Sequence, residues 1–232
     1  MPPSLTPPFH ILRGLPRPLR PAAAALYWDG FGHLLLPFAA DRRRGQALVA
    51  SSLNPEQALV ALSPAGALIG LMGWRGVQGG FLSPTPARFR RVWGPMRGRA
   101  CHLATRLWRP GPATSDLIVD GIIIAPEWRK RGICRALLAH AGQIAAERGH
   151  PGLRVEVEAA NQPALSAYAA LGFQPVTRAR AGWAWTRHPA HILRRPLAAA
   201  AQPRPNIPET CASSVKARPE RVSASAASMS SP

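Results

Sequence analysis

The spacing of hydrophobic residues along the chain predicts a mixture of helices and strands. In the first half, alanine, leucine and aromatic residues recur at helical spacing, and two apolar runs flank the turn Ser63-Pro64-Ala65-Gly66 and predict a β-hairpin. In chain order, this half is expected to contain a short strand at 10–13, helices at 21–37 and 45–54 separated by a basic loop at 41–44, strands at 57–62 and 67–74, and helical pieces at 87–93 and 100–109.

The pattern is clearer after residue 116. The apolar run at 117–124 predicts a buried strand, and apolar residues on one face predict a helix at 135–148, which Gly149 ends. Residues 153–158 alternate between apolar and charged, which predicts a strand with one polar, solvated face. The remaining predicted elements are a helix at 162–171, a strand from Phe173, and a last strand around Trp183-Ala184-Trp185.

This order of elements predicts one α/β domain over residues 9–190, between two segments that lack a core pattern. Residues 1–8 are rich in proline and are expected to be flexible. Residues 191–232 form a basic segment rich in Ala, Pro and Ser, a composition typical of disordered tails. Neither a secretory leader nor an uninterrupted span of about 20 apolar residues is found, so we expect a cytoplasmic protein without a membrane helix.

The formal net charge of +18 predicts that the protein attracts polyanions, such as a phosphorylated cofactor, nucleic acid or anionic lipid. The charge is spread along the chain, and no zinc-finger spacing or aromatic–basic RNA motif accompanies it, so nucleic acid is a secondary alternative. The cysteines Cys101, Cys134 and Cys211 are far apart and odd in number, which fits a reducing compartment. The histidines show no metal-ligand spacing, so we expect no metal.

One short loop has the pattern of an anion-binding site. The segment Arg129-Lys130-Arg131-Gly132-Ile133-Cys134-Arg135 lies directly at the start of the helix predicted from 135. Backbone N–H groups at a helix N-terminus lack partners within the helix, and the helix dipole adds positive charge there. A glycine at this position lets a pyrophosphate approach the backbone closely.

The surrounding residues make the loop more specific. This stretch resembles the GNAT family of N-acetyltransferases, whose acyl-CoA loop reads Gln or Arg, two residues, Gly, one residue, then Gly or Ala. Ala125-Pro126-Glu127-Trp128 before the loop and Arg135-Ala136-Leu137-Leu138 after it are similar to the family. The later run from Asn161 through Tyr168 to Leu171-Gly172-Phe173 is similar too. The resemblance covers about 60 residues and implies a mixed, mostly antiparallel sheet flanked by helices, with two central strands that splay to hold acyl-CoA.

The resemblance also implies roles for individual residues. Backbone groups of Ile122, Ile123 and Ile124 would pair with the pantetheine arm of acetyl-CoA, and one N–H near Ile122 or Ile123 would polarise the thioester carbonyl. The seven residues from Arg129 to Arg135 would hold the pyrophosphate. Asn161 would bond the cofactor arm, and Tyr168 would protonate the leaving thiolate. The amine acceptor would attack the thioester directly.

Cys134 departs from the family pattern, because Gly or Ala is usual there. Cysteine is small enough for phosphate binding to survive, and we expect the helix N-terminus and the nearby arginines to lower the pKa of its thiol. A nucleophilic role for Cys134 is the alternative, although no histidine is placed beside it.

The base that deprotonates the acceptor amine is less clearly marked. Asp120 is the candidate, because strand alternation would place residues 118, 120 and 122 on one face. The alternative is that Asp120 is structural and bonds a neighbouring loop. Glu156 and Glu158 are further candidates, with a solvated strand face as the other interpretation. Tyr168 could likewise be a half-buried core residue.

The acceptor site is assigned to residues 30–110, whose arginines hint at an anionic acceptor, and Trp93 or Trp108 could line it. The sequence thus predicts an acetyl-CoA-dependent N-acyltransferase, monomeric or homodimeric. Two alternatives remain: an acyl-CoA-binding or regulatory protein of the same fold with little catalysis, and a basic protein that associates with nucleic acid.

Overall fold

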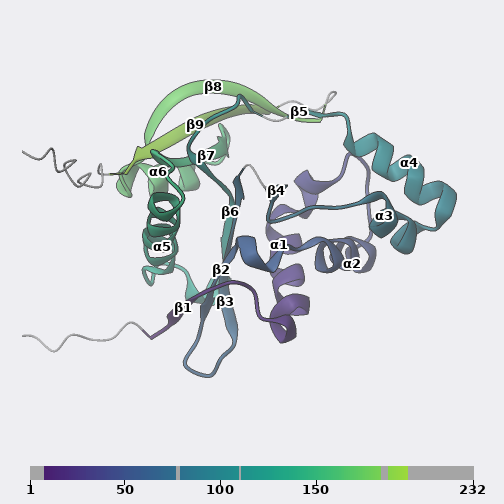
Figure 1. The fold of residues 1–232 in the computed structure, drawn as a ribbon, viewed down its shortest axis with the longest axis horizontal. Coiled ribbons are helices and arrows are strands. Elements are labelled where there is room, and N and C mark those ends of the chain that lie inside the picture. Colours follow the sequence, from purple (N-terminus) through teal and green to yellow (C-terminus); the bar gives the residue numbers. More distant parts are fainter. Residues whose placement is uncertain (1–7, 77–78, 110, 184–187, 198–232) are drawn as a thin grey trace, which may run out of the picture. The chain divides into compact units, whose positions relative to one another are not determined.

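A β-sheet separates two groups of helices (Figure 1). The computed structural model describes residues 8–76, 79–109, 111–183 and 188–197. The strands in these ranges are β1 (His10–Arg13), β2 (Ala58–Leu62), β3 (Leu68–Gly76), β4 (Gly79–Gly80), β5 (Trp108–Arg109), β6 (Leu117–Ile124), β7 (Gly152–Glu158), β8 (Gln174–Trp183) and β9 (His188–Pro196). The helices are α1 (Arg20–Leu35), α2 (Arg42–Ser52), α3 (Pro86–Trp93), α4 (Pro95–Thr105), α5 (Ile133–Glu147) and α6 (Gln162–Ala170).

The strands follow the order β1-β2-β3-β6-β7-β9-β8-β5, and β4 pairs with β3. Every neighbouring pair is antiparallel except β6 and β7, which are parallel. A helical crossover through α5 joins those two strands, as a parallel connection requires. The predicted mixed, mostly antiparallel sheet with flanking helices is therefore confirmed.

Each face of the sheet is covered by its own hydrophobic cluster. Helices α5 and α6 pack on one face around Leu137, Leu138 and Phe173. Helices α1 and α2 cover the other face, with Tyr27 and Val49 buried against the strands. A third cluster around Phe89 attaches the α3–α4 pair to α2 and to the segment after α1. None of the helices in the described residues is both long and apolar enough to span a membrane.

The predicted elements are present, with three corrections. Residues 41–44 are not a loop, because Asp41 caps α2 by accepting a hydrogen bond from the Arg44 N–H at 2.9 Å and the helix begins at Arg42. Helix α4 spans Pro95–Thr105 rather than residues 100–109, and Trp108–Arg109 form strand β5 instead of the end of that helix.

The third correction concerns the end of the domain. Strand β9 continues to Pro196, paired with β7 from Glu158↔Ala190 to Gly152↔Pro196, so the predicted boundary at residue 190 falls inside a strand. Trp183 ends β8 instead of lying in the last strand, and Trp185 lies outside the described residues. The predicted flexible start at 1–8 and the predicted tail beyond 197 also lie outside them, except for Pro8.

We predict that Gly73→Ala destabilises the protein. A Cβ atom at Gly73 would lie 2.5 Å from the Cβ of Phe81, whose side chain is fully buried and packs edge-on against Tyr27. Forcing an extra methyl group into a packed core costs about 1–3 kcal/mol, which should lower the Tm by several degrees in a thermal unfolding experiment. Gly76→Ala on the same strand meets open space and is the control. Equal Tm values for the two variants would contradict this packing.

Candidate active site

The parallel strands β6 and β7 separate partway along their length. They are in register only for Leu117↔Leu153, Ile118↔Arg154 and Val119↔Val155. Beyond this point β6 stays paired with β3 as far as Ile124, while β7 stays paired with β9 as far as Glu158. The facing edges at 120–124 and 156–158 therefore have no strand partner across the opening, and the backbone groups there that make no other hydrogen bond are available to a ligand. The predicted splay of the two central strands is present.

A bulge at Asp120 accompanies the opening. On β3, Gly73 pairs with Gly121 and Trp74 with Val119, so Asp120 has no partner, and Gly121 has a φ of 136°. Val119 and Ile122 both pack in the cluster on the α5 side, which means that the alternation of side chains shifts by one residue. The predicted common face of residues 118, 120 and 122 is therefore wrong.

The Asp120 carboxylate is enclosed by charged neighbours from two strands. Its side chain is 24% exposed, and its Oδ1 lies 3.8 Å from Nη2 of Arg75 on β3. Burial raises the pKa of Asp120 to about 6, with Arg75 opposing the shift and Glu156 adding to it. Tyr27 on α1 donates a hydrogen bond to the Asp120 carbonyl oxygen at 3.2 Å, which ties this point of β6 to the helix.

The polar face predicted for β7 is largely enclosed. Arg154 is only 4% exposed; it pairs with Glu156 at 2.8 Å and donates to the Pro112 carbonyl at 2.6 Å. The prediction of a solvated strand face is therefore wrong at Arg154. Glu156 is held by this buried arginine on the strand that faces Asp120 across the opening, whereas Glu158 lies at the end of β7.

The basic loop leads into α5 as predicted. Gly132 is the N-cap with a left-handed φ of 81°, a Cβ atom there would meet nothing within 4 Å, and Lys130 also has a positive φ of 61°. Ile133 is buried and anchors the start of the helix. The four basic side chains of the loop, Arg129, Lys130, Arg131 and Arg135, are exposed. An open space at a helix N-terminus surrounded by cations fits a pyrophosphate.

Two of these arginines are positioned by neighbours. The guanidinium of Arg131 lies 4.9 Å from the centre of a Trp128 ring. Arg129 donates from Nε to the Ile124 carbonyl at 3.3 Å, which connects the loop to the end of β6. The loop and the unpaired edge of β6 are thus held as one continuous surface.

Tyr168 and Cys134 lie close together beside this loop. The Tyr168 ring packs edge-on against Phe173 with centroids 5.2 Å apart, and among the described residues its hydroxyl has no hydrogen-bond partner. Burial raises the pKa of Tyr168, and Cys134 contributes to this shift. Burial also raises the pKa of the Cys134 thiol, with Arg195 opposing it, so the predicted lowering is wrong. The helix N-terminus is outweighed by the loss of solvent around the sulfur.

Asn161 caps helix α6 and keeps its side-chain amide N–H groups exposed. Its Oδ1 accepts a hydrogen bond from the Ala164 N–H at 3.2 Å and caps α6. The two N–H bonds of its exposed side-chain amide still face solvent and can donate to a ligand.

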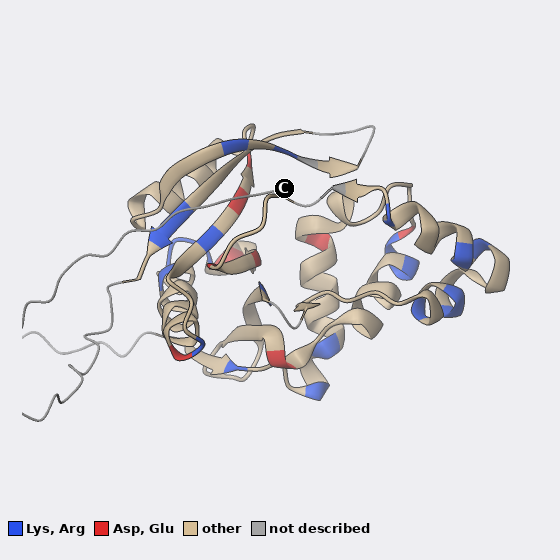
Figure 2. Ribbon diagram, turned by 45° about the horizontal axis from the view of Figure 1, so that its top comes forward, with Lys and Arg blue, Asp and Glu red and all other residues tan. Residues whose placement is uncertain are grey.

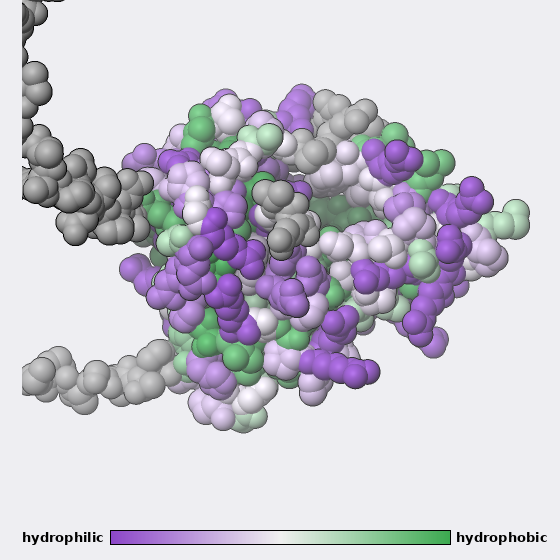
Figure 3. Space-filling model, in the orientation of Figure 1, coloured by the Kyte–Doolittle hydropathy of each residue, from purple (hydrophilic) through white to green (hydrophobic). Residues whose placement is uncertain are grey.

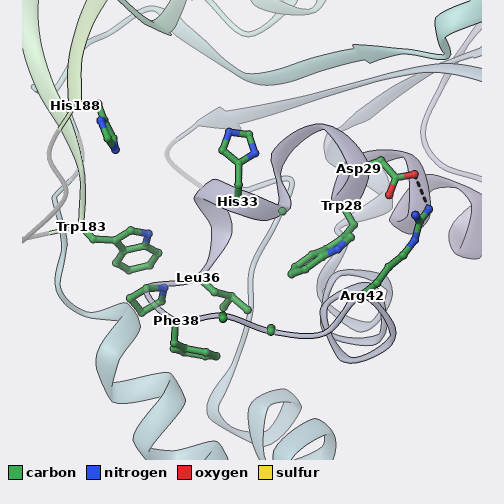
Figure 4. Close-up of a pocket in the computed structure, with 12 residues that line it drawn as sticks. Trp28, Asp29, His33, Leu36, Phe38, Arg42, Trp183 and His188 are labelled. Carbon is green, nitrogen blue, oxygen red and sulfur yellow. Dashed lines mark hydrogen bonds and ion pairs between the residues drawn. The ribbon is translucent and has the colours of Figure 1, made fainter. Parts of the chain in front are cut away.

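A cavity of about 650 Å³ lies next to the opening. Its wall includes Trp28, Asp29 and His33 from α1, Phe38 from the following segment, and Trp183 and His188 from β8 and β9 (Figure 4). A Cβ atom on Gly121 would lie 2.9 Å from Phe31, so α1 touches β6 at the bulge, less than one helical turn from Trp28 and His33. Figure 3 shows a hollow on this face with hydrophobic residues in its depth.

The predicted acceptor range 30–110 contains most of the described lining residues, but Trp28, Asp29, Trp183 and His188 lie outside it. The lining comes from residues 28–42 together with residues 183 and 188, and no local motif connects those two segments. Trp93 and Trp108 are not among the lining residues; Trp93 packs against Phe38, and Trp108 packs against Trp183. They support aromatic residues that line the cavity.

Comparisons with known proteins identify the family to which this fold belongs. The sequence model of the acetyltransferase (GNAT) family matches residues 54–173, and the chain belongs to this family. Over 57 residues the chain is 44% identical to the streptothricin acetyltransferase of Streptomyces lavendulae. The aligned stretch covers 25% of this chain and 30% of that protein.

Solved structures show the same fold. A crystal structure of an acetyltransferase superposes with a TM-score of 0.56 at 18% identity, covering 82% of this chain and 100% of that one. The Salmonella typhimurium protein yncA, determined with its cofactor acetyl-CoA, superposes with a TM-score of 0.52 at 15% identity, covering 84% of this chain and 98% of its own. At these identities the likeness concerns the fold alone.

We predict that Asp120→Asn stabilises the protein at neutral pH. The folded-state pKa of Asp120 is raised, so its contribution to stability is full below the unfolded pKa of about 4 and is lost as the pH rises through about 6. The variant should therefore have a Tm higher by about 2–5 °C at pH 7.5, and the difference should shrink toward pH 4.5.

Asp29→Asn is the matched control, because Asp29 forms an exposed ion pair with Arg42 at 2.7 Å. Such pairs contribute little, and this exchange should change the Tm by less than about 2 °C. A lower Tm for Asp120→Asn at pH 7.5 would show instead that the charge is a net stabilising partner of Arg75.

Proposed function

We propose that this protein transfers the acetyl group of acetyl-CoA to a primary amine by direct attack of the amine on the thioester. The observation that carries the proposal is the opening between β6 and β7, with an accessible glycine at a basic helix N-terminus on one side and a half-buried carboxylate on the other. The match to the GNAT family and the partial similarity to streptothricin acetyltransferase support acetyl transfer. The yncA structure with acetyl-CoA supports the choice of donor.

The chain offers complementary groups to each part of the donor, which supplies an activated acyl thioester. The backbone N–H groups from Gly132 to Arg135 and the four basic side chains of the loop would hold the pyrophosphate. The backbone groups of Ile122, Ile123 and Ile124 that do not pair with β3 would pair with the pantetheine arm like an added strand. The amide of Asn161 would donate to the same arm. A backbone N–H at Ile122 or Ile123 would stabilise charge on the carbonyl oxygen.

Asp120 would accept the proton of the acceptor amine. With a pKa of about 6 it is mainly ionised at neutral pH. A lysine-like amine has a pKa of about 10.4, so complete transfer before attack would be uphill by about 6 kcal/mol. The neutral fraction of the amine, which has a free lone pair, would therefore attack, and the carboxylate would hydrogen-bond its N–H and take the proton that the nitrogen must lose once the C–N bond forms. Arg75 lowers the pKa of this carboxylate and Glu156 raises it.

Tyr168 would donate to the leaving sulfur. Its raised pKa keeps the phenol protonated over the physiological range. A thiol has a pKa of about 8.5, below that of this phenol, so hydrogen-bond donation to the developing thiolate contributes more than complete proton transfer. Its unpaired hydroxyl is consistent with this role.

The acceptor would occupy the cavity lined by Trp28, Phe38 and Trp183. Among the described lining residues, the charged side chains Asp29 and Arg42 pair with each other at 2.7 Å, which leaves no free arginine in this part of the wall for an anionic acceptor. Three aromatic side chains favour an amine carried on a flat or apolar body, whose cation can lie against an indole face. This differs from the anionic acceptor that the sequence suggested.

The test is release of free CoA in the presence of a panel of aromatic, aliphatic and peptide amines. We expect turnover with at least one apolar amine, and Tyr168→Phe should lower kcat by about 10- to 100-fold while KM for acetyl-CoA stays within about twofold, because one charge-assisted hydrogen bond is lost. An unchanged Tm would show that the isosteric exchange leaves the fold intact. Tight acetyl-CoA binding without turnover on any amine would instead favour a regulatory protein.

A further inference from the structure

A second cavity, of about 1140 Å³, lies between the first turns of the chain and helices α2 and α3. It shares no lining residue with the cavity beside β6. Five arginines line it: Arg17 and Arg20 at the start of α1, Arg43 and Arg44 on α2, and Arg91 on α3. With Asp41 as the one acid in its lining, the wall has a net charge of +4.

Most of this charge is not used within the protein. Among the described residues, the side chains of Arg17, Arg43 and Arg91 make no ion pair or hydrogen bond, and the Arg20 side chain has a single long bond to the Ala50 carbonyl at 3.4 Å. Asp41 is already engaged, since its carboxylate caps α2 and lies 3.5 Å from Nη1 of Arg44. The arginines are therefore not held there to stabilise neighbouring carboxylates.

The surrounding sequence keeps this side positive. From Gln57 to Ser115 the chain contains no Asp or Glu, and this stretch includes the whole of α3 and α4. Figure 2 shows the arginine positions on the helices to the right of the sheet, with few acidic positions near them. Unneutralised cations at this density repel one another, which a bound polyanion would relieve.

We propose that this cavity binds the phosphodiester backbone of a nucleic-acid strand. Arginine presents a planar fork that fits phosphate oxygens, and here five such forks come from three separate elements around one concave surface. The cavity has no aromatic or amide side chain in its lining, so it has no group suited to stacking on a base or reading its edge. Binding is therefore independent of sequence.

Other anions fit less well. The cavity is far larger than a single phosphate, and four of its five arginines are exposed, so an isolated small anion would contact only part of the charge. An anionic membrane surface is recognised best by a convex, apolar helix face, whereas the large apolar lining residues here, Leu15 and Val92, are buried or half-buried in a concavity.

The experiment measures binding of a fluorescent 20-nucleotide oligouridylate to the full chain by anisotropy, from 50 to 200 mM KCl. The triple variant Arg17→Gln, Arg43→Gln, Arg91→Gln removes three unpaired charges without breaking an internal contact. We expect its Kd to rise at least about tenfold at 100 mM salt, and the slope of log K against log salt to become less steep by about 2, or 0.7 for each lost phosphate contact.

The matched control removes the same charge from α4 and its end, through Arg97→Gln, Arg99→Gln and Arg106→Gln, whose side chains also make no ion pair or hydrogen bond among the described residues. Its Kd should change less than about threefold, with the salt slope unchanged. Equal losses in both triple variants would overturn the proposal, because affinity would then follow net charge rather than the cavity. Two other results would also overturn it. One is that the wild type does not bind the oligouridylate. The other is that the cavity variant loses binding to phosphatidylserine vesicles but keeps its affinity for the oligouridylate. Unchanged acetyl-CoA binding and circular dichroism serve as checks of folding.

Discussion

The separation of β6 from β7 after three paired residues is the constraint on which the rest of the site depends. Each strand stays hydrogen-bonded to a partner on its outer side, β3 for β6 and β9 for β7, so the sheet remains paired on both sides of the opening. The bulge at Asp120 falls where the pairing ends, and increased local twist is what a bulge produces. Tyr27 secures the same point from α1.

The opening brings two kinds of chemistry to one place. On one side are the basic loop, the start of α5, Cys134 and Tyr168. Positive charge and free backbone N–H groups at the loop can bind an anion there. On the other are Asp120, Arg75 and Glu156, where burial raises the pKa of Asp120 to about 6, with Arg75 opposing the shift and Glu156 adding to it. The aromatic cavity adjoins this second side through α1. Donor and acceptor groups can thus approach from separate directions.

The sequence predicted the parts whose determinants are local. The loop from Arg129 to Arg135 and the helix predicted at 162–171 each depend on contiguous residues, and the structure has both elements in place. The bulge at Asp120 was missed because it depends on the register with β3, which strand alternation does not encode. The pKa of Cys134 was predicted in the wrong direction, because burial beside Tyr168 arises only from tertiary packing. The two cavities join segments distant in sequence, so no pattern could have indicated them.

Calorimetric titration of acetyl-CoA tests the central claim most directly, with the wild type beside Gly132→Glu and Gly149→Glu. Gly132 precedes α5 and Gly149 follows it, and both have a positive φ and open space around them. The two substitutions therefore introduce similar backbone strain and the same negative charge. Gly132→Glu places a carboxylate where the pyrophosphate is expected. We predict binding by the wild type and by Gly149→Glu with Kd in the micromolar range, and a loss of at least about 100-fold for Gly132→Glu. Equal affinities for all three proteins, or no binding by the folded wild type, would contradict the placement of acyl-CoA at this opening.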